Sequence, residues 1–188
     1  MGRKSAQIGV IGVVGILFGA ATVTAHAQSD ARPELCAARE AVPAQLRPSD
    51  CRLAAAIADG MKRSLTFRRL VEQVGTLNGI VYIQLRQSVN LQTKRVLDGA
   101  LSHSITTAGA YRLLHVIVGA VQGDRPIYIL AHELQHAIEV LGAPHVSTEH
   151  DVDQLFERIG LHAFAGDAET QAALDIERTV RSELARRD

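Results

Sequence analysis

The sequence predicts an α+β fold, in which a sheet of a few strands packs against several helices. Two observations lead to this prediction. Segments in which apolar residues have helical spacing flank short β-branched segments that are typical of strands. The order is helix, strands and then further helices, and 188 residues suffice for one domain with a buried core. We therefore expect one small layered domain.

The first 27 residues have the three-part pattern of a secretory signal peptide. Arg3 and Lys4 form a basic start, residues 8–23 are apolar and almost uncharged, and Ala25-His26-Ala27 resembles a signal-peptidase site. An uncleaved anchor is the alternative, because such a run can nearly span a bilayer. The glycines and the small residues favour cleavage after Ala27. The pattern thus predicts a secreted or periplasmic protein with no stable membrane insertion.

Residues 28–52 are predicted to form an N-terminal arm before a domain over residues 53–188. Prolines at positions 33, 43 and 48 interrupt any helix there. Cys36 and Cys51 are the only cysteines, and export exposes them to an oxidising compartment. We expect a disulfide between them, which would close a loop of about 15 residues and contribute about 3 kcal/mol. Without C-x-x-C spacing, they are poor zinc ligands.

Helices and strands within the domain follow from apolar spacing and from residues typical of their ends. Gly60 and Gly75 are expected to end the first two helices, and Ser64 is a typical N-cap for the second. Helices are predicted over residues 53–60, 64–75, 127–141, 149–159 and 168–186. Strands are predicted over residues 80–85 and 111–118, with a weaker one within 96–106.

Composition excludes two classes of protein. The 20 Lys and Arg residues balance 20 Asp and Glu residues, and the arginines are scattered instead of forming a basic stripe. We therefore expect no nucleic-acid partner. With 47% hydrophobic residues and charges of both signs, the chain is also too apolar to be disordered.

The pattern that indicates chemistry is His132-Glu133-Leu134-Gln135-His136. Two histidines four residues apart lie on one face of a helix, so that both can bind one metal ion. Glu133 beside them is suited to hold a metal-bound water and to take its proton. The flanking residues are apolar on nearly all sides, which predicts a buried helix. Buried ionisable groups need partners, and a metal ion supplies one.

With these residues the chain resembles the zincins, the zinc metallopeptidases that carry H-E-x-x-H. The close match covers five residues and their helix, within a similar order of strands and helices. Glu139 and Gly142 stand where the metzincin group has glycine and histidine, so the chain departs from that group. The resemblance implies a zincin-like domain, a Zn²⁺ cofactor, a peptide or protein substrate, and Glu133 as the catalytic base. It also implies that the edge of the strand over residues 111–118 binds substrate.

Gluzincins take their third zinc ligand from a later helix, and Glu169 matches this position best. It is expected on the buried face of the last helix, seven residues before Ile176. Glu149 is an alternative, although a glutamate in a first helical turn ordinarily serves as a cap. Further alternatives remain open at His145, His150, Asp153 and Glu139. His103 and His115 are interpreted as isolated histidines of the surface or core.

The sequence thus predicts an exported zinc-dependent hydrolase, a small metallopeptidase whose metal ligands are His132, His136 and Glu169. The alternative is a non-catalytic zinc-binding or interaction domain in the cell envelope. Glu133 distinguishes the two, because a purely structural zinc site has no use for a base beside its ligands.

Overall fold

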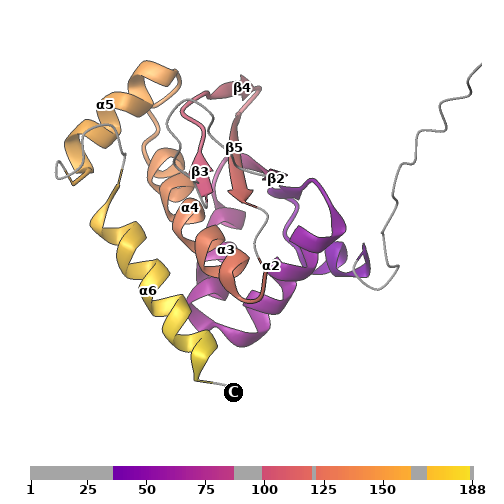
Figure 1. Ribbon diagram of the computed structural model, residues 1–188. Coiled ribbons are helices and arrows are strands. Elements are labelled where there is room, and N and C mark those ends of the chain that lie inside the picture. The colour runs from indigo at the N-terminus through magenta and orange to yellow at the C-terminus, as the bar shows by residue number, and fades with distance from the viewer. Residues whose placement is uncertain (1–35, 87–98, 120–121, 162–168, 187–188) are drawn as a thin grey trace, which may run out of the picture. The chain divides into compact units, whose positions relative to one another are not determined.

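The computed structural model describes residues 36–86, 99–119, 122–161 and 169–186 (Figure 1). These residues form five α-helices, a short 3₁₀ helix and a mixed sheet of five strands, so the predicted α+β fold is confirmed. The expected signal peptide, residues 1–27, lies outside the described residues.

The helices are η1 (Ala38–Ala41), α2 (Cys51–Arg63), α3 (Leu65–Thr76), α4 (Arg125–Gly142), α5 (Glu149–Ile159) and α6 (Gln171–Ala185). The strands are β1 (Leu46–Pro48), β2 (Gly79–Arg86), β3 (Gly99–Leu101), β4 (Thr106–Ala108) and β5 (Tyr111–Gly119). Within the described ranges, no helix is long and apolar enough to cross a membrane.

The segment expected to be an arm contributes a strand to the sheet. β1 pairs in parallel with β2, with Leu46 opposite Val81, and the Leu46 side chain is buried. Pro48 is tolerated because β1 is an edge strand, so its missing N–H is not needed for a second neighbour. The predicted disulfide is present between Cys36 and Cys51, whose Cα atoms lie 4.7 Å apart. It joins the chain before η1 to the first turn of α2.

Gly60 does not end a helix, contrary to the sequence prediction. It lies inside α2, where a Cβ atom would come within 2.6 Å of Ile127 and 2.8 Å of Phe67. Glycine therefore serves close packing between helices here. Ser64 caps α3 as predicted, because its hydroxyl accepts a hydrogen bond from the Phe67 N–H at 2.9 Å.

The sheet has the order β1-β2-β5, all parallel, with β3 and β4 both antiparallel to the far side of β5. Both sides of β5 are therefore paired. The expectation that residues 111–118 offer an edge for substrate is wrong, because the edge of the sheet on that side is formed by β3 and β4. β4, which was not predicted, joins β5 through a two-residue turn in which Gly109 has φ 61°.

Helix α4 occupies the centre of the fold, and twelve of its eighteen residues are buried. It packs on β5 and β3 and contacts α2, α3 and α6, and α6 runs beside it for most of its length (Figure 1). Arg112 of β5 fixes the end of α4. Its guanidinium donates hydrogen bonds to the carbonyl groups of Val140, Leu141, Ala143 and Val146. The central helix is thus packed against the sheet and three helices, and Arg112 binds its C-terminal end.

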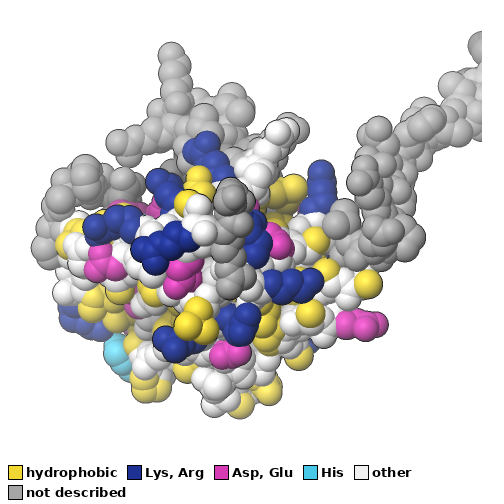
Figure 2. Space-filling view, turned by 90° about the horizontal axis from the view of Figure 1, so that it is seen from below, with side chains coloured by type: hydrophobic (Ala, Val, Ile, Leu, Met, Phe, Trp, Pro, Cys, Tyr) yellow, Lys and Arg dark blue, Asp and Glu magenta, His cyan; other side chains and the backbone are white. Residues whose placement is uncertain are grey.

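Charges on the surface are mixed. On the face shown in Figure 2, Lys and Arg side chains lie among Asp and Glu side chains. Among the ion pairs are Arg63 with Asp124, which joins the end of α2 to the residue before α4, and Arg181 with Glu177 on α6.

Candidate metal centre

The central helix brings the imidazole rings of His132 and His136 together. The residues are one helical turn apart, both are buried, and their Nε2 atoms lie 3.1 Å from each other. Their ring planes meet at 77° with centroids 4.8 Å apart. Both rings therefore direct an Nε2 atom to the same point.

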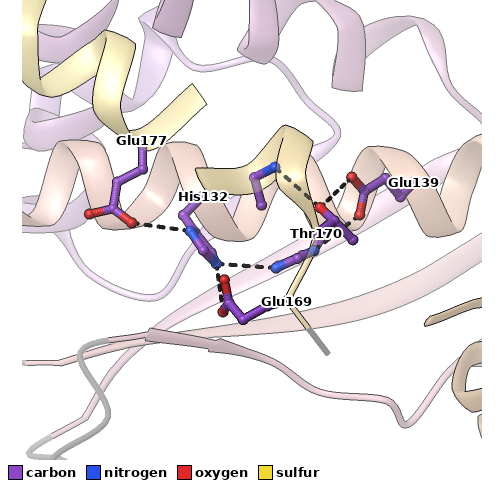
Figure 3. Close-up of polar contacts among 7 residues, drawn as sticks. His132, Glu139, Glu169, Thr170 and Glu177 are labelled. Atoms are coloured by element: carbon purple, nitrogen blue, oxygen red, sulfur yellow. Dashed lines mark hydrogen bonds and ion pairs between the residues drawn. The ribbon is translucent and has the colours of Figure 1, made fainter. Parts of the chain in front are cut away.

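The other ring nitrogen of each histidine contacts a carboxylate (Figure 3). His132 Nδ1 lies 3.1 Å from Glu177 Oε2 on α6, and His136 Nδ1 lies 3.0 Å from Glu139 Oε2 on α4. An ionised carboxylate only accepts hydrogen bonds, so each Nδ1 carries the proton. This arrangement orients metal-binding histidines and leaves the Nε2 lone pairs for the ion.

Glu169 completes the group. Its Oε1 lies 3.2 Å from His132 Nε2, and the ligand atoms of His132, His136 and Glu169 lie within 4.8 Å of one another. Glu169 stands two residues before the first residue of α6, so it is not on the buried face of that helix as expected. The chain entering the helix positions it.

Thr170, the N-cap of α6, links this entry to the histidines. Its hydroxyl accepts a hydrogen bond from the Ala173 N–H and donates one to Glu139 Oε1 at 2.8 Å. Glu139 in turn contacts His136. The residue that begins α6 is therefore tied to the carboxylate that orients the second histidine (Figure 3).

The group fits a metal cation. When both histidines are neutral and carry their protons on Nδ1, the two Nε2 atoms and Glu169 Oε1 are three acceptors that face one another with no hydrogen-bond donor among them. Glu169 Oε2 is buried and has no hydrogen-bond partner among the described residues. Buried acceptors without partners are costly, and a cation or a proton satisfies them. Two His nitrogens and a carboxylate oxygen are ligands that zinc prefers.

Electrostatics at the group favour positive charge. Burial lowers the pKa of His132, but the hydrogen bond to Glu169 and the carboxylates of Glu133 and Glu177 outweigh it, so the pKa is raised. The hydrogen bond from His132 lowers the pKa of Glu169. A proton on His132 Nε2 and a metal ion are thus alternatives for the same lone pair.

Glu133 lines a pocket of about 250 Å³ together with His132 and Glu169. Its side chain is buried and accepts a hydrogen bond from the Leu101 N–H of β3. Burial raises its pKa to about 7. Gly99 packs against it so closely that a Cβ atom there would lie 2.7 Å from Glu133 Oε1.

The alternative ligands lie elsewhere or have other partners. Glu149 and His150 are exposed in the first turn of α5, and His150 Nε2 contacts Gln154. His145 contacts Arg158. Glu139 lies near the group, but it faces His136 Nδ1 instead of the converging Nε2 atoms.

Asp153, the last alternative, pairs with His103 Nδ1 at 2.6 Å. The His103 ring also stacks on Phe156, with centroids 5.5 Å apart, and Phe156 packs edge-on against His136. His103 is therefore not isolated, in contrast to the sequence interpretation. It joins the loop between β3 and β4 to α5 beside the metal centre.

Sequence reasoning missed Glu177 and Thr170. Glu177 lies four residues after Ala173 and three before Val180, both buried on α6, so its position at the border of the apolar stripe was a usable signal. A carboxylate at the border of such a stripe lies next to a neighbouring element, and here Glu177 contacts His132 of α4.

Comparison of the chain with family models, with curated proteins and with solved structures gives no match. A function for this chain must therefore be argued from the site itself.

Proposed function

We propose that this protein is an exported zinc-dependent hydrolase that acts on peptide bonds, with His132, His136 and Glu169 as zinc ligands and Glu133 as the catalytic base. One observation carries the proposal: the ligand atoms of His132, His136 and Glu169 converge, and two of these residues, His132 and Glu169, line a pocket that Glu133 also lines. This set is the two-histidine, one-glutamate ligand set of gluzincins, which supports the resemblance noted from H-E-x-x-H.

Bound zinc would supply a Lewis acid that polarises a carbonyl group and makes a water acidic. The chain's own residues perform the other tasks. Glu177 and Glu139 hold the two imidazole rings in the tautomer that presents Nε2. Glu133 would accept a proton from the attacking water and later deliver it to the leaving amine. The Leu101 N–H orients the Glu133 carboxylate for both transfers.

Export is supported by two features. Residues 1–27 have the signal-peptide pattern, and the disulfide between Cys36 and Cys51 is of a kind that an oxidising compartment preserves.

The test is hydrolysis of a peptide library by the zinc-loaded protein, followed by mass spectrometry, beside the Glu133→Gln variant. We expect cleavage by the wild type and a loss of rate of about 10²- to 10⁴-fold in the variant, because glutamine cannot take a proton. Zinc content must be equal in both proteins. Bound zinc without any cleavage would instead support a non-catalytic zinc-binding domain.

A further inference from the structure

The pocket beside the metal centre has two ends of opposite charge. His132, Glu133 and Glu169 line one end, where the carboxylates suit a cation. Arg125 of α4 and Arg181 of α6 line the other end, together with Tyr128. Glu177 lies between the ends, because Oε2 contacts His132 and Oε1 contacts Arg181. The metal end and the arginine end are therefore parts of one pocket.

Arg181 is held in place by two contacts. Its Nη2 donates a hydrogen bond to Glu177 Oε1 at 2.9 Å, and its guanidinium lies 4.3 Å from the centre of the Tyr128 ring. A guanidinium has five N–H donors in a planar fork, so these contacts orient the group and leave donors for a ligand. Such a group binds a carboxylate at little cost in side-chain entropy.

The distance from the arginine end to the metal end follows from the helix. Arg125 precedes His132 by seven residues, which is two turns on the same face and about 10 Å along the axis. A peptide in extended conformation covers about 3.3 Å per residue. Because the single carboxylate of Glu177 contacts both His132 and Arg181, a group held at the arginine end lies no more than a few residues from a carbonyl group at the metal end.

From this geometry we propose that Arg125 and Arg181 bind a carboxylate of the peptide substrate, within a few residues of the carbonyl group that reacts. The inference rests on the proposed function, because it assumes that the metal end is where the peptide is attacked. The carboxylate belongs either to the C-terminus of the substrate or to an acidic side chain, and both offer the same bidentate partner to a guanidinium.

The experiment measures peptide affinity, using the zinc-loaded protein with Glu133→Gln so that no peptide is cleaved. Three acetylated pentapeptide probes are compared by calorimetry. The first is penta-alanine with a free C-terminal carboxylate, and the second is penta-alanine with a C-terminal amide. The third also has a C-terminal amide, but its last alanine is replaced by glutamate. We expect one of the two carboxylate probes to bind about tenfold more tightly than the neutral amide. The probe that binds more tightly shows whether the site takes a C-terminal carboxylate or an acidic side chain.

The double variant Arg125→Gln, Arg181→Gln, made in the same background, should abolish this preference. Arg178→Gln is the matched control, since Arg178 lies on α6 one turn before Arg181 but pairs with Asp175 and is not among the residues that line the pocket. The control should keep the preference. Equal affinity for all three probes, or no binding of any, would overturn the proposal. So would a preference that survives the double variant, because the zinc ion would then hold the carboxylate.

The two proposals fail in distinguishable ways. Cleavage of library peptides by the wild-type protein without any carboxylate preference would contradict the arginine site and leave the hydrolase standing. A preference that depends on both arginines, with no cleavage by the wild type, would support the arginine site and contradict the hydrolase.

Discussion

Glu177 Oε2 lies 3.1 Å from His132 Nδ1, so a carboxylate on α6 sets the orientation of a ligand on α4. The contact joins two residues that are 45 positions apart in the chain. Glu169 and Thr170, immediately before α6, add the third candidate ligand and a hydrogen bond to Glu139. The metal centre therefore exists only when these two helices are packed together.

Replacing Glu177 should weaken zinc binding. Without the carboxylate, His132 loses the partner that fixes its tautomer, and we expect the zinc affinity of Glu177→Ala to fall about 10- to 100-fold. Competition with a chromophoric chelator measures this affinity. Asp175→Ala is the control, because Asp175 is an exposed carboxylate two residues earlier on α6 that pairs with Arg178. Equal affinities in both variants would show that Glu177 does not support the ligand.

Gly99→Ala should displace Glu133. The new methyl group would lie 2.7 Å from Glu133 Oε1 and 2.5 Å from Ile129 Cγ2, so the carboxylate or β3 must move. Since a displacement of about 1 Å can cost a hundredfold in rate, we expect a loss of that order in peptide hydrolysis with zinc content unchanged. Gly142→Ala has open space for its methyl group and should keep the rate. A fully active Gly99→Ala variant would argue against Glu133 as the base.

Arg112→Ala should destabilise the fold. Four carbonyl groups near the end of α4 lose a donor, and we expect a loss of about 2 kcal/mol in the free energy of unfolding. Urea denaturation measures it. Arg69→Ala, an exposed position on α3, should change stability by less than about 0.5 kcal/mol. Similar midpoints for the two variants would contradict this role of Arg112.

Stability should fall in acid because of two carboxylates with lowered pKa values. The hydrogen bond with Arg63 lowers the pKa of Asp124. Burial alone would raise the pKa of Glu183, but hydrogen bonds from Ser64 and Thr66 outweigh it and lower the pKa. A carboxyl group whose pKa is lower in the folded state than in the unfolded state stabilises the fold at pH values above its unfolded-state pKa. This stabilisation is lost as the pH falls through the folded-state pKa.

Melting temperatures measured from pH 7 down to about pH 2 test this, because unfolded carboxyls titrate near pH 4. Glu183→Gln should lower the melting temperature at pH 7 and flatten its decline in acid. Glu157→Gln, at an exposed position on α5, should follow the wild type. A decline in Glu183→Gln as steep as that of the wild type would exclude Glu183 as a cause.

The sequence predicted those helices and strands whose bounds depend on neighbouring residues, such as caps and regular apolar spacing. The helix over residues 149–159 is found with those bounds, because Thr148 caps it and its apolar stripe is regular. Gly60 was misinterpreted, since its packing against Ile127 depends on a distant helix. β1 was missed because its parallel pairing with β2 is a long-range contact, which a three-residue segment that ends in Pro48 does not reveal.

For the site as well, features that depend on neighbouring residues were predictable and features that depend on long-range packing were not. The spacing of His132, Glu133 and His136 placed these residues on one helix, so their proximity was predictable. That Glu169 approaches the histidines was expected from a resemblance, but its place before α6 was not, because it depends on how the chain enters that helix. Glu177 required knowing which face of α6 packs on α4.

The most direct test of the metal centre is elemental analysis of residues 28–188 after reconstitution with zinc, beside Glu133→Gln and Glu169→Ala. We predict about one zinc per chain in the wild type and in Glu133→Gln, and clearly less in Glu169→Ala, which loses a ligand. Absence of zinc from the reconstituted wild type would contradict the metal centre and with it the proposed hydrolase.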